Sequence, residues 1–239
     1  MKAYDVIKRA LLIIGVLTIS KISAAFPESS EYAVPDTSHV LGQIQIVSGV
    51  SPTGAKTYEI PIETYPGMNG LTPKFSLVYN SQHGNSVVGR GWAISGLSVI
   101  SRSNKNIYFD GKPKGISMKA DDAFVLDGVR LIHLRTTGSY AMYETETGNI
   151  KARAVVSGDV VKYFEVFYPD GRRGIFGIAT NKLNSLCYPI TSVVDMHGNK
   201  INYSYTVVNN CYNISNVTYN GASIEFKYSQ SRSDPLRLY

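Results

Sequence analysis

The stretch that decides the fold is residues 51–102, SPTGAKTYEIPIETYPGMNGLTPKFSLVYNSQHGNSVVGRGWAISGLSVISR. Apolar and polar side chains alternate over Thr57–Glu63 and again over Lys74–Asn80. A period of two, with turn residues between the runs, is typical of antiparallel strands that bury one face. The stretch therefore predicts a β protein, and it contains the only tryptophan of the chain, Trp92.

A proline and two glycines in this stretch carry further information. Pro61 lies inside a predicted strand and has no backbone N–H to donate, so we expect a sheet edge or a bulge there. Gly89-x-Gly91 suggests part of a dinucleotide-binding loop, but the third glycine position is Ile94 and no helical pattern follows. We expect these glycines instead to let the backbone approach closely around Trp92.

Beyond residue 96, short strand-like runs alternate with turn pairs such as Asp127-Gly128 and Asn220-Gly221, which are preferred centres of tight hairpins. We therefore predict an all-β fold, a series of successive antiparallel hairpins that form a sheet or a partial shell. Only Asn181–Leu186 has the pattern of a short helical turn. The expected strands are Val40–Ser48, Thr57–Glu63, Lys74–Asn80, Leu97–Ser101, Asn106–Phe109, Ala123–Leu126, Val129–Leu134, Tyr140–Glu144, Ile150–Val156, Val160–Tyr168, Arg173–Ile178, Ile190–Val194, Lys200–Val207, Ile214–Tyr219 and Ala222–Tyr228.

Residues 1–25 have the three parts of a secretory signal peptide. Basic residues are followed by the apolar run Ala10–Ile19 and by small residues before a cut after Ala25. The run is shorter than the roughly 20 residues of a membrane-spanning helix, which disfavours an uncleaved anchor. We expect a signal-peptide helix, a polar extended leader over 26–39 and one β domain over 40–239. The protein would be exported to the periplasm, the cell surface or the medium, without a stable membrane span after cleavage.

The amino-acid composition limits the kinds of partner that the protein can bind. Hydrophobic residues make up 44% of the chain, which is typical of a folded protein. The formal net charge is +6, and about half of it lies in the N-terminal segment. No cluster of lysine and arginine with interleaved aromatic residues occurs, so we expect no nucleic-acid partner.

The two cysteines, Cys187 and Cys211, belong to the exported part. In an oxidising compartment they either form a disulfide, which would close a loop of about 25 residues and contribute roughly 3 kcal/mol, or remain buried thiols. The spacing in the sequence does not decide between these alternatives, because a disulfide depends on geometry.

The sequence contains no recognisable catalytic or metal-binding arrangement. The four histidines lack zinc spacing, the GxSxG motif is absent, and Asp121-Asp122 is not part of an EF-hand series. These two carboxylates would point to opposite faces of an extended chain and begin the turn before the Ala123 strand. We therefore predict a protein that is not an enzyme and that needs no metal or cofactor.

One triplet leaves a remote enzymatic alternative. Glu144 and Glu146 would share one face of a strand, as the catalytic glutamates of ADP-ribosyltransferases do. That chemistry also needs an upstream NAD-binding arginine and a Ser-Thr-Ser strand, and neither is evident. The simpler interpretation is a solvated strand end before the Gly148-Asn149 turn.

Several spaced elements of residues 51–102 occur in one order: PTGA, YxIPI, PGxxGLxP, LxYNS, GxGW and IxR. This order resembles the start of the SpvB/TcB family, which comprises the virulence-plasmid B protein and the B subunits of insecticidal Tc toxins. Residues 195–205 resemble an RHS/YD-type unit of that family. The motif residues are Pro52, Thr53, Gly54, Tyr58, Pro61, Pro66, Gly67, Gly70, Tyr79, Asn80, Gly89, Gly91, Trp92, Arg102, Asp195, Gly198, Asn199, Tyr203 and Tyr205.

The resemblance implies a β-rich shell segment, in which antiparallel strands spiral into a hollow wall around a toxic C-terminal piece. Relatives continue beyond the point that corresponds to Tyr239, so we expect a truncated or split product without cargo or self-cleavage machinery. An unfinished sheet would leave open edges that pair with other strands. The expected partners are other RHS or toxin components, or the missing C-terminal part of the same protein.

Three functions follow from these observations. The first is a non-enzymatic, exported structural segment of a toxin-like RHS protein. The second is a free-standing secreted β module that binds a surface ligand such as a glycan. The third, an enzyme related to ADP-ribosyltransferases, rests only on the glutamate triplet and on domains that some relatives carry.

Overall fold

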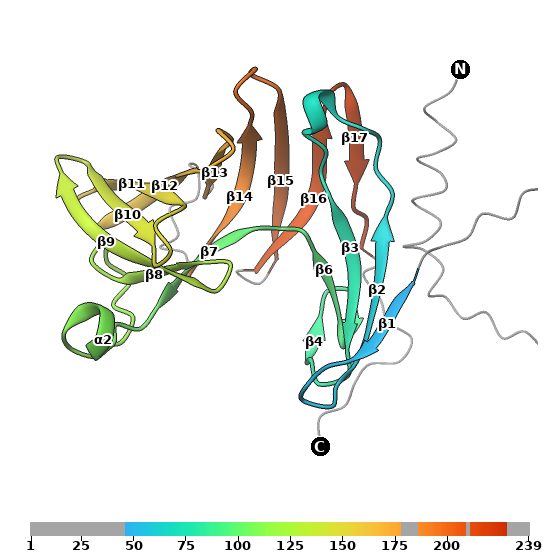
Figure 1. Ribbon diagram of the computed structural model, residues 1–239, viewed down its shortest axis with the longest axis horizontal. Helices are drawn as coiled ribbons and strands as arrows, with labels where there is room; N and C mark the ends of the chain where they lie inside the picture. Colours follow the sequence, from blue (N-terminus) through green and yellow to red (C-terminus); the bar gives the residue numbers. More distant parts are fainter. Residues whose placement is uncertain (1–45, 178–185, 209–210, 229–239) are drawn as a thin grey trace, which may run out of the picture. The chain divides into compact units, whose positions relative to one another are not determined.

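The computed structural model describes residues 46–177, 186–208 and 211–228 (Figure 1). Several predictions lie outside these ranges: the signal peptide with its cut after Ala25, the leader, most of the strand expected over Val40–Ser48, and nearly all of Asn181–Leu186. Within them the chain is almost entirely antiparallel β, which confirms the predicted fold class. It divides into two compact units, one of residues up to 63 with 76–93, the other of residues 64–75 with 94 onward.

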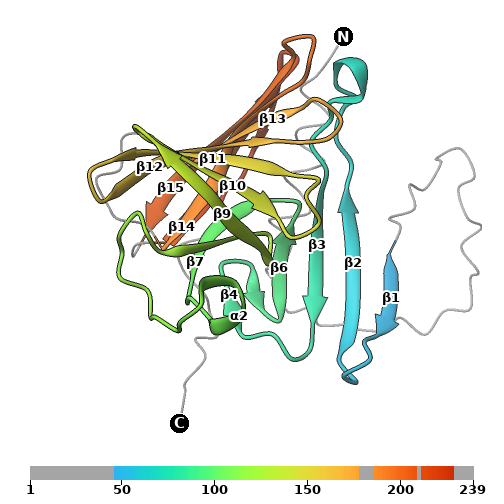
Figure 2. The same ribbon diagram turned by 60° about the vertical axis from the view of Figure 1, so that its left-hand side comes forward.

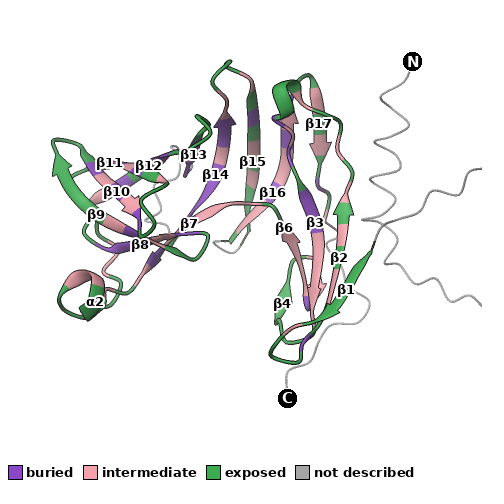
Figure 3. Cartoon of the chain, in the orientation of Figure 1, coloured by how far each residue is buried: buried purple, intermediate pink, exposed green. Residues whose placement is uncertain are grey.

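The first unit is built on a four-stranded sheet in the order β1-β2-β3-β6. β2 therefore has a neighbour on each side, but its pairing with β1 ends at Glu59, two residues before Pro61. β1 is exposed along its whole length (Figure 3). The elements are β1 Val47–Val50, β2 Lys56–Ile62, β3 Phe75–Asn80, the small hairpin β4 Asn85–Ser86 and β5 Gly89–Arg90, and β6 Trp92–Ser95. The first residue of β3 and the last two residues of β6 belong to the second unit.

The second unit contains eight consecutive strands that pair antiparallel with one another. Figure 2 shows β9 to β12 side by side, and β8 joins them to β7 by strand pairing. The strands are β7 Val99–Ser103, β8 Ala123–Leu126, β9 Val129–Thr137, β10 Tyr140–Thr145, β11 Lys151–Ser157, β12 Val160–Phe167, β13 Arg173–Phe176 and β14 Cys187–Val194.

β14 closes this ring, because β7 and β13 pair with its two opposite edges. The Ile190 backbone N–H donates to Ser98, next to β7, at 3.0 Å. The Pro189 carbonyl accepts from Gly177, next to β13, at 2.8 Å. Neighbouring residues of a strand direct their backbone groups to opposite edges, so the two partners must flank β14. We call β7 to β14 the eight-stranded ring.

The sheet continues past the ring. Ser192–Val194 of β14 pair with β15 Lys200–Val208, on the edge whose other half, Cys187–Pro189, pairs with β7. β16 Cys211–Tyr219 and β17 Ala222–Glu225 follow in order. A sheet or partial shell was expected, whereas the closure of β7 to β14 was not. Among the described residues, β17 has a strand partner on one side only.

Aromatic side chains fill the ring. Phe124 lies at the centre, with its ring centroid 5.0 Å from that of Phe164 and 5.8 Å from that of Tyr143, both in edge-on contacts. Phe124 and Phe164 have no exposed surface, and the small Ala152 and Ala154 of β11 make room for them. Alternating buried residues along the strands thus meet in one packed interior.

The strands beyond the ring bury a smaller cluster. Phe75 makes edge-on contacts with Tyr203 of β15 and with Phe226, at centroid distances of 6.5 and 5.8 Å. The Tyr219 hydroxyl donates to the Tyr65 carbonyl at 3.1 Å. The connection that contributes Tyr65 and Phe75 contains the single 3-10 turn η1, Met68–Gly70.

One strand prediction is wrong. Asn106–Phe109 were expected to be extended, but Ile107–Asp110 form the short helix α2. The Asn106 side chain accepts a hydrogen bond from the Phe109 N–H at 2.8 Å, and Gly111 ends the helix in the left-handed conformation. An asparagine cap and a glycine five residues later outweigh the strand preference of the aromatic residues between them.

Candidate functional site

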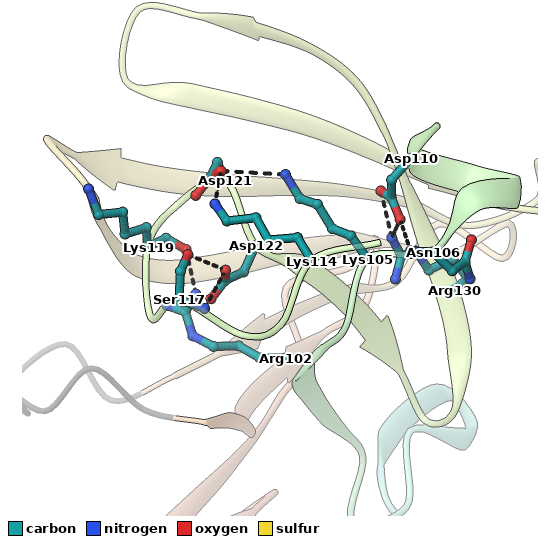
Figure 4. A network of polar contacts seen from close by, with 10 residues as sticks. All are labelled: Arg102, Lys105, Asn106, Asp110, Lys114, Ser117, Lys119, Asp121, Asp122 and Arg130. Carbon is teal, nitrogen blue, oxygen red and sulfur yellow. Dashed lines mark hydrogen bonds and ion pairs between the residues drawn. The ribbon is translucent and has the colours of Figure 1, made fainter. Parts of the chain in front are cut away.

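A network of polar and charged side chains lies in residues 102–130 of the second unit (Figure 4). α2 is fixed there by an ion pair, in which Arg130 Nη2 donates to both carboxylate oxygens of Asp110, at 2.8 and 2.6 Å. The same Asp110 carboxylate accepts from the Asn106 backbone N–H at 2.9 Å. These contacts attach the loop that follows β7 to strand β9.

A second ion pair is completely buried. Arg102 of β7 donates from Nη1 to Asp122 at 2.8 Å, and the exposed fractions of the two side chains are 0% and 1%. Arg102 also donates to the Tyr188 hydroxyl at 2.9 Å, and its guanidinium lies 5.2 Å from the centroid of Phe124. A buried ion pair needs such further contacts to offset the desolvation of both charges. Arg102, a predicted motif residue, therefore connects the loop to the ring interior.

Hydrogen bonds keep the Asp122 carboxylate ionised. Burial has the largest single effect and raises its pKa, but hydrogen bonds from Ser117 and the ion pair with Arg102 together hold the pKa below its ordinary value. Neighbouring Asp121 is exposed and pairs with Lys105 and Lys114, and its pKa is lowered, first by the hydrogen bond from Lys114. The two carboxylates thus point in different directions, as the sequence indicated.

A cavity of about 540 Å³ lies between this loop and strands β9 and β10. Its lining includes Arg130, Leu131 and Tyr143 of the ring and Asp121 of the loop. The sequence missed this site. The only local sequence pattern that pointed to it was the Asn106 cap followed by Asp110-Gly111. The ion pairs could not be predicted, because Arg102 and Arg130 each lie 20 residues from their partners, Asp122 and Asp110.

The chemistry of the site is that of fixed charges. Within residues 46–177, 186–208 and 211–228, no group of three or more histidine, cysteine, aspartate or glutamate residues is arranged to hold a metal ion. The carboxylates of Asp110, Asp121 and Asp122 are each paired with a cation. Charges held in pairs suit the positioning of a loop and of a bound ligand. They do not suit proton transfer at neutral pH, which needs a group with a pKa near that pH.

The two glutamates of the enzymatic alternative do not share a strand. β10 ends at Thr145, and Glu146 is exposed in the turn that follows. Glu144 is half-buried on β10. The alternation that would place both carboxylates on one face stops between them, which fits the simpler interpretation of a strand end.

The motif residues of the first unit gather around an aromatic row. Tyr79 lies between Tyr58 and Trp92, with centroid distances of 5.9 and 5.2 Å. Gly91 is buried and has φ +78°, and a β-carbon there would lie 2.5 Å from the Tyr79 ring. Gly89 by contrast faces open space. The close approach of backbone and aromatic ring in this unit therefore depends on Gly91. The neighbouring motif residues Pro52, Thr53 and Gly54 form the exposed β1–β2 turn, and Asn80 ends β3.

The remaining motif residues belong to the second unit. Gly67, which follows Pro66, has no room for a side chain, because a β-carbon would lie 1.8 Å from the Leu71 carbonyl oxygen. The Asp195 carboxylate accepts from the backbone N–H groups of His197 and Asn199, at 2.9 and 2.8 Å, and closes the β14–β15 turn. The other motif positions here are Gly70 and Gly198, both with positive φ, and Tyr203 and Tyr205, both half-buried on β15.

Cys187 on β14 and Cys211 on β16 are both free thiols in the structure. Burial raises the pKa of Cys187, and the charge of Cys211 raises it further, so the two groups are near enough to interact. The disulfide alternative stays a prediction.

No helix in the described ranges has the length and apolar character needed to cross a bilayer.

Comparison with known proteins identifies the class. Residues 50–166 match the model of the SpvB family, described as Salmonella virulence plasmid 65kDa B protein. A crystal structure of TcdB2-TccC3 is similar at a TM-score of 0.61, with 17% identity over 80% of this chain and 11% of that one. The Photorhabdus luminescens Tc holotoxin pore is similar at 0.58, with 18% identity and the same coverage. None of the curated proteins matches the chain.

The fold and the family match define a β-rich segment of the SpvB type. Residues 50–166 match the SpvB family model, as the motif order in residues 51–102 suggested, and the fold is similar to part of the Tc toxin chains. It spans about a tenth of the length of the Tc toxin chains that it resembles.

Proposed function

We propose that this chain is an exported, non-enzymatic structural segment of a toxin-like RHS/YD-repeat protein, part of a β shell that encloses or supports another toxin component. The observation that carries the proposal is the continuation of the sheet beyond the filled ring through β15, β16 and β17. A wall that grows by antiparallel pairing can be lengthened by further strands. The small share of the Tc chains that this fold occupies, 11%, supports a role within a larger assembly.

The outer edge of β17 is the proposed place of assembly. The Phe226 N–H donates to Ser215 of β16 at 2.9 Å. Because alternate residues face opposite edges, the N–H groups of Ser223 and Glu225 point away from β16. An edge with outward donors accepts a strand from another chain or from another part of the same protein. The proposed partner is a strand of an RHS/YD-repeat toxin component.

Two further features support the proposal. The ion-paired carboxylates of the charged loop offer no general base, and Glu146 lies in an exposed turn, which favours a structural role over ADP-ribosyl transfer. The basic, apolar and small-residue pattern of residues 1–25 favours export. The expected product therefore acts outside the inner membrane together with other toxin proteins.

The test uses the full chain, tagged and secreted from the bacterium that encodes it. We expect it to co-purify with an RHS/YD-repeat chain that mass spectrometry identifies. Glu225→Pro removes an outward N–H without touching the β16–β17 hydrogen bonds, so it should abolish co-purification. Glu225→Ala keeps the N–H and should co-purify normally.

Two results would contradict the proposal. One is a wild-type chain that is secreted as a stable, protease-resistant monomer with no toxin component attached. The other is transfer of ADP-ribose from labelled NAD to host protein by the purified chain, lost in Glu146→Gln.

A further inference from the structure

The cavity beside α2 has the size of a small-molecule site. Its volume of about 540 Å³ lies within the range of roughly 300–1,000 Å³ that is usual for such sites. It opens where inward-facing ring residues meet the charged loop of residues 104–122. Both aromatic side chains, such as Tyr143, and charged side chains, such as Asp110 and Arg130, line it.

Tyr143 contributes a hydroxyl that lacks a partner. The side chain is only 3% exposed, and contacts with Phe124, Phe164 and His133 fix its ring. Tyr143 lines the cavity, and no described residue forms a hydrogen bond with its hydroxyl. Burial raises its pKa to about 12, so the hydroxyl keeps its proton at neutral pH. Because this oxygen is not among the buried polar atoms without a partner, it is open to the cavity, where a ligand oxygen can accept its hydrogen bond.

Arg130 contributes a second unsatisfied donor to the same wall. Its two terminal nitrogens donate to Asp110 and to the Asn104 carbonyl, the latter at 3.2 Å. Its Nε, by contrast, is buried without a partner, and the whole side chain is 9% exposed. This nitrogen is enclosed by protein atoms, so the Tyr143 hydroxyl is the donor of the two that a ligand can reach.

Each carboxylate that lines the cavity has at least one cation beside it, so none of them is left free to hold a cationic ligand. Five cations accompany the four carboxylates, because Lys105 and Lys114 share Asp121. Each carboxylate nevertheless keeps lone pairs that can accept further hydrogen bonds. The pairs are Asp110 with Arg130, Asp121 with Lys105 and Lys114, Asp122 with Arg102, and Asp159 with Lys119.

From these observations we propose that the cavity binds a neutral, hydroxyl-rich ligand, namely a saccharide. Sugar hydroxyls both donate and accept, so they satisfy the Tyr143 hydroxyl and the carboxylate rim at the same time. The aromatic residues Phe109 and His133 also line the cavity and can offer apolar contact to the C–H groups of a sugar ring. The proposal does not depend on the structural role of the chain, since a shell segment can carry such a site on its surface.

The experiment titrates the full chain, after export, with free neutral hexoses, N-acetylhexosamines and their disaccharides, and follows binding by saturation-transfer NMR. Tyr143→Phe removes the hydroxyl and keeps the ring, so it should weaken binding about two- to tenfold. Tyr163→Phe makes the same change on β12 outside the cavity and should leave binding as in the wild type. Circular dichroism of both variants shows whether the fold is retained.

Three outcomes would overturn the proposal. The first is the absence of binding for every neutral saccharide of the panel at millimolar concentration. The second is equal binding by wild type and Tyr143→Phe, which would place the ligand elsewhere. The third is tighter binding of a charged probe, inorganic phosphate or N-acetylneuraminic acid, than of any neutral sugar. A failure of toxin assembly would not produce any of these results, so the two proposals can fail separately.

Discussion

The eight-stranded ring of the second unit and the four-stranded sheet of the first use the same alternating pattern but stabilise it differently. In the ring, side chains from opposite strands meet, so Phe124 and Phe164 lose all exposed surface. In the sheet, Tyr79 and Trp92 contact neighbours on the same sheet and remain half-buried. In a closed ring, the alternating apolar side chains thus form a buried core. In the open sheet they stay partly exposed, so the stability of that sheet depends more on the geometry of its turns.

The largest expected effect is on the buried ion pair of the ring. Arg102→Ala leaves the Asp122 carboxylate without its cation in an apolar surrounding, which should lower the free energy of unfolding by about 5 kcal/mol. Chemical denaturation measures the change. Arg172→Ala is the matched control, because its pair with Asp170 is half-exposed and should contribute less than about 1 kcal/mol. Similar losses in both variants would show that the ring does not depend on buried charge.

Removal of aromatic side chains compares the two regions directly. Phe124→Ala should cost about 4 kcal/mol, because a fully buried ring leaves a cavity. Trp92→Ala should cost about 2 kcal/mol, since the side chain is only half-buried. Scanning calorimetry of both variants gives the ranking. The reverse order would mean that the first unit, and not the ring, holds the more stable core.

A glycine tests the importance of turn geometry in the first unit. Gly91→Ala should destabilise by about 2 kcal/mol, because it adds a clash with Tyr79 to the strain of a positive φ. Gly54→Ala has a similar φ but open space around it, so strain alone should cost about 1 kcal/mol. Trp92 fluorescence follows unfolding in both variants, as it is the only tryptophan. Equal losses of stability in the two variants would show that the contact with Tyr79 is not the cause.

The smallest expected effect is acid sensitivity confined to the second unit. Every described carboxyl whose pKa is lowered belongs to that unit, namely Asp121, Asp122, Asp170 and Asp195. A lowered folded pKa contributes stability above the unfolded pKa of about 4, which is lost as the pH falls through the folded value. Thermal melts from pH 6 to pH 2 or so should therefore show the second unit losing stability first. An earlier change in Trp92 fluorescence would contradict the assignment.

Local sequence patterns predicted most strands, because period-two alternation and Asp-Gly or Asn-Gly pairs act within a few residues. Ala123–Leu126 match β8 without change, and the Asn220-Gly221 turn has the expected positive φ at both residues. The error at Ile107–Asp110 has a local cause, since the capping side chain of Asn106 decides between helix and strand.

Contacts between distant residues could not be predicted in this way. The closure of the ring joins β7 to β14, some 88 residues apart, and no short pattern specifies that pairing. The candidate site depends on the same closure, because Arg102 reaches Tyr188 only across it. The motif order identified the family without revealing which residues would gather around a cavity.

The position of β14 in the chain has a consequence for how the protein is made. β14 is the last strand of the ring and pairs with both β7 and β13, so the ring stays open until residues 187–194 have left the ribosome or the export channel. During that interval two strand edges are free to pair with other chains. The order of synthesis thus sets an interval before closure, during which the free edges of β7 and β13 are the places where a chaperone would protect the nascent protein.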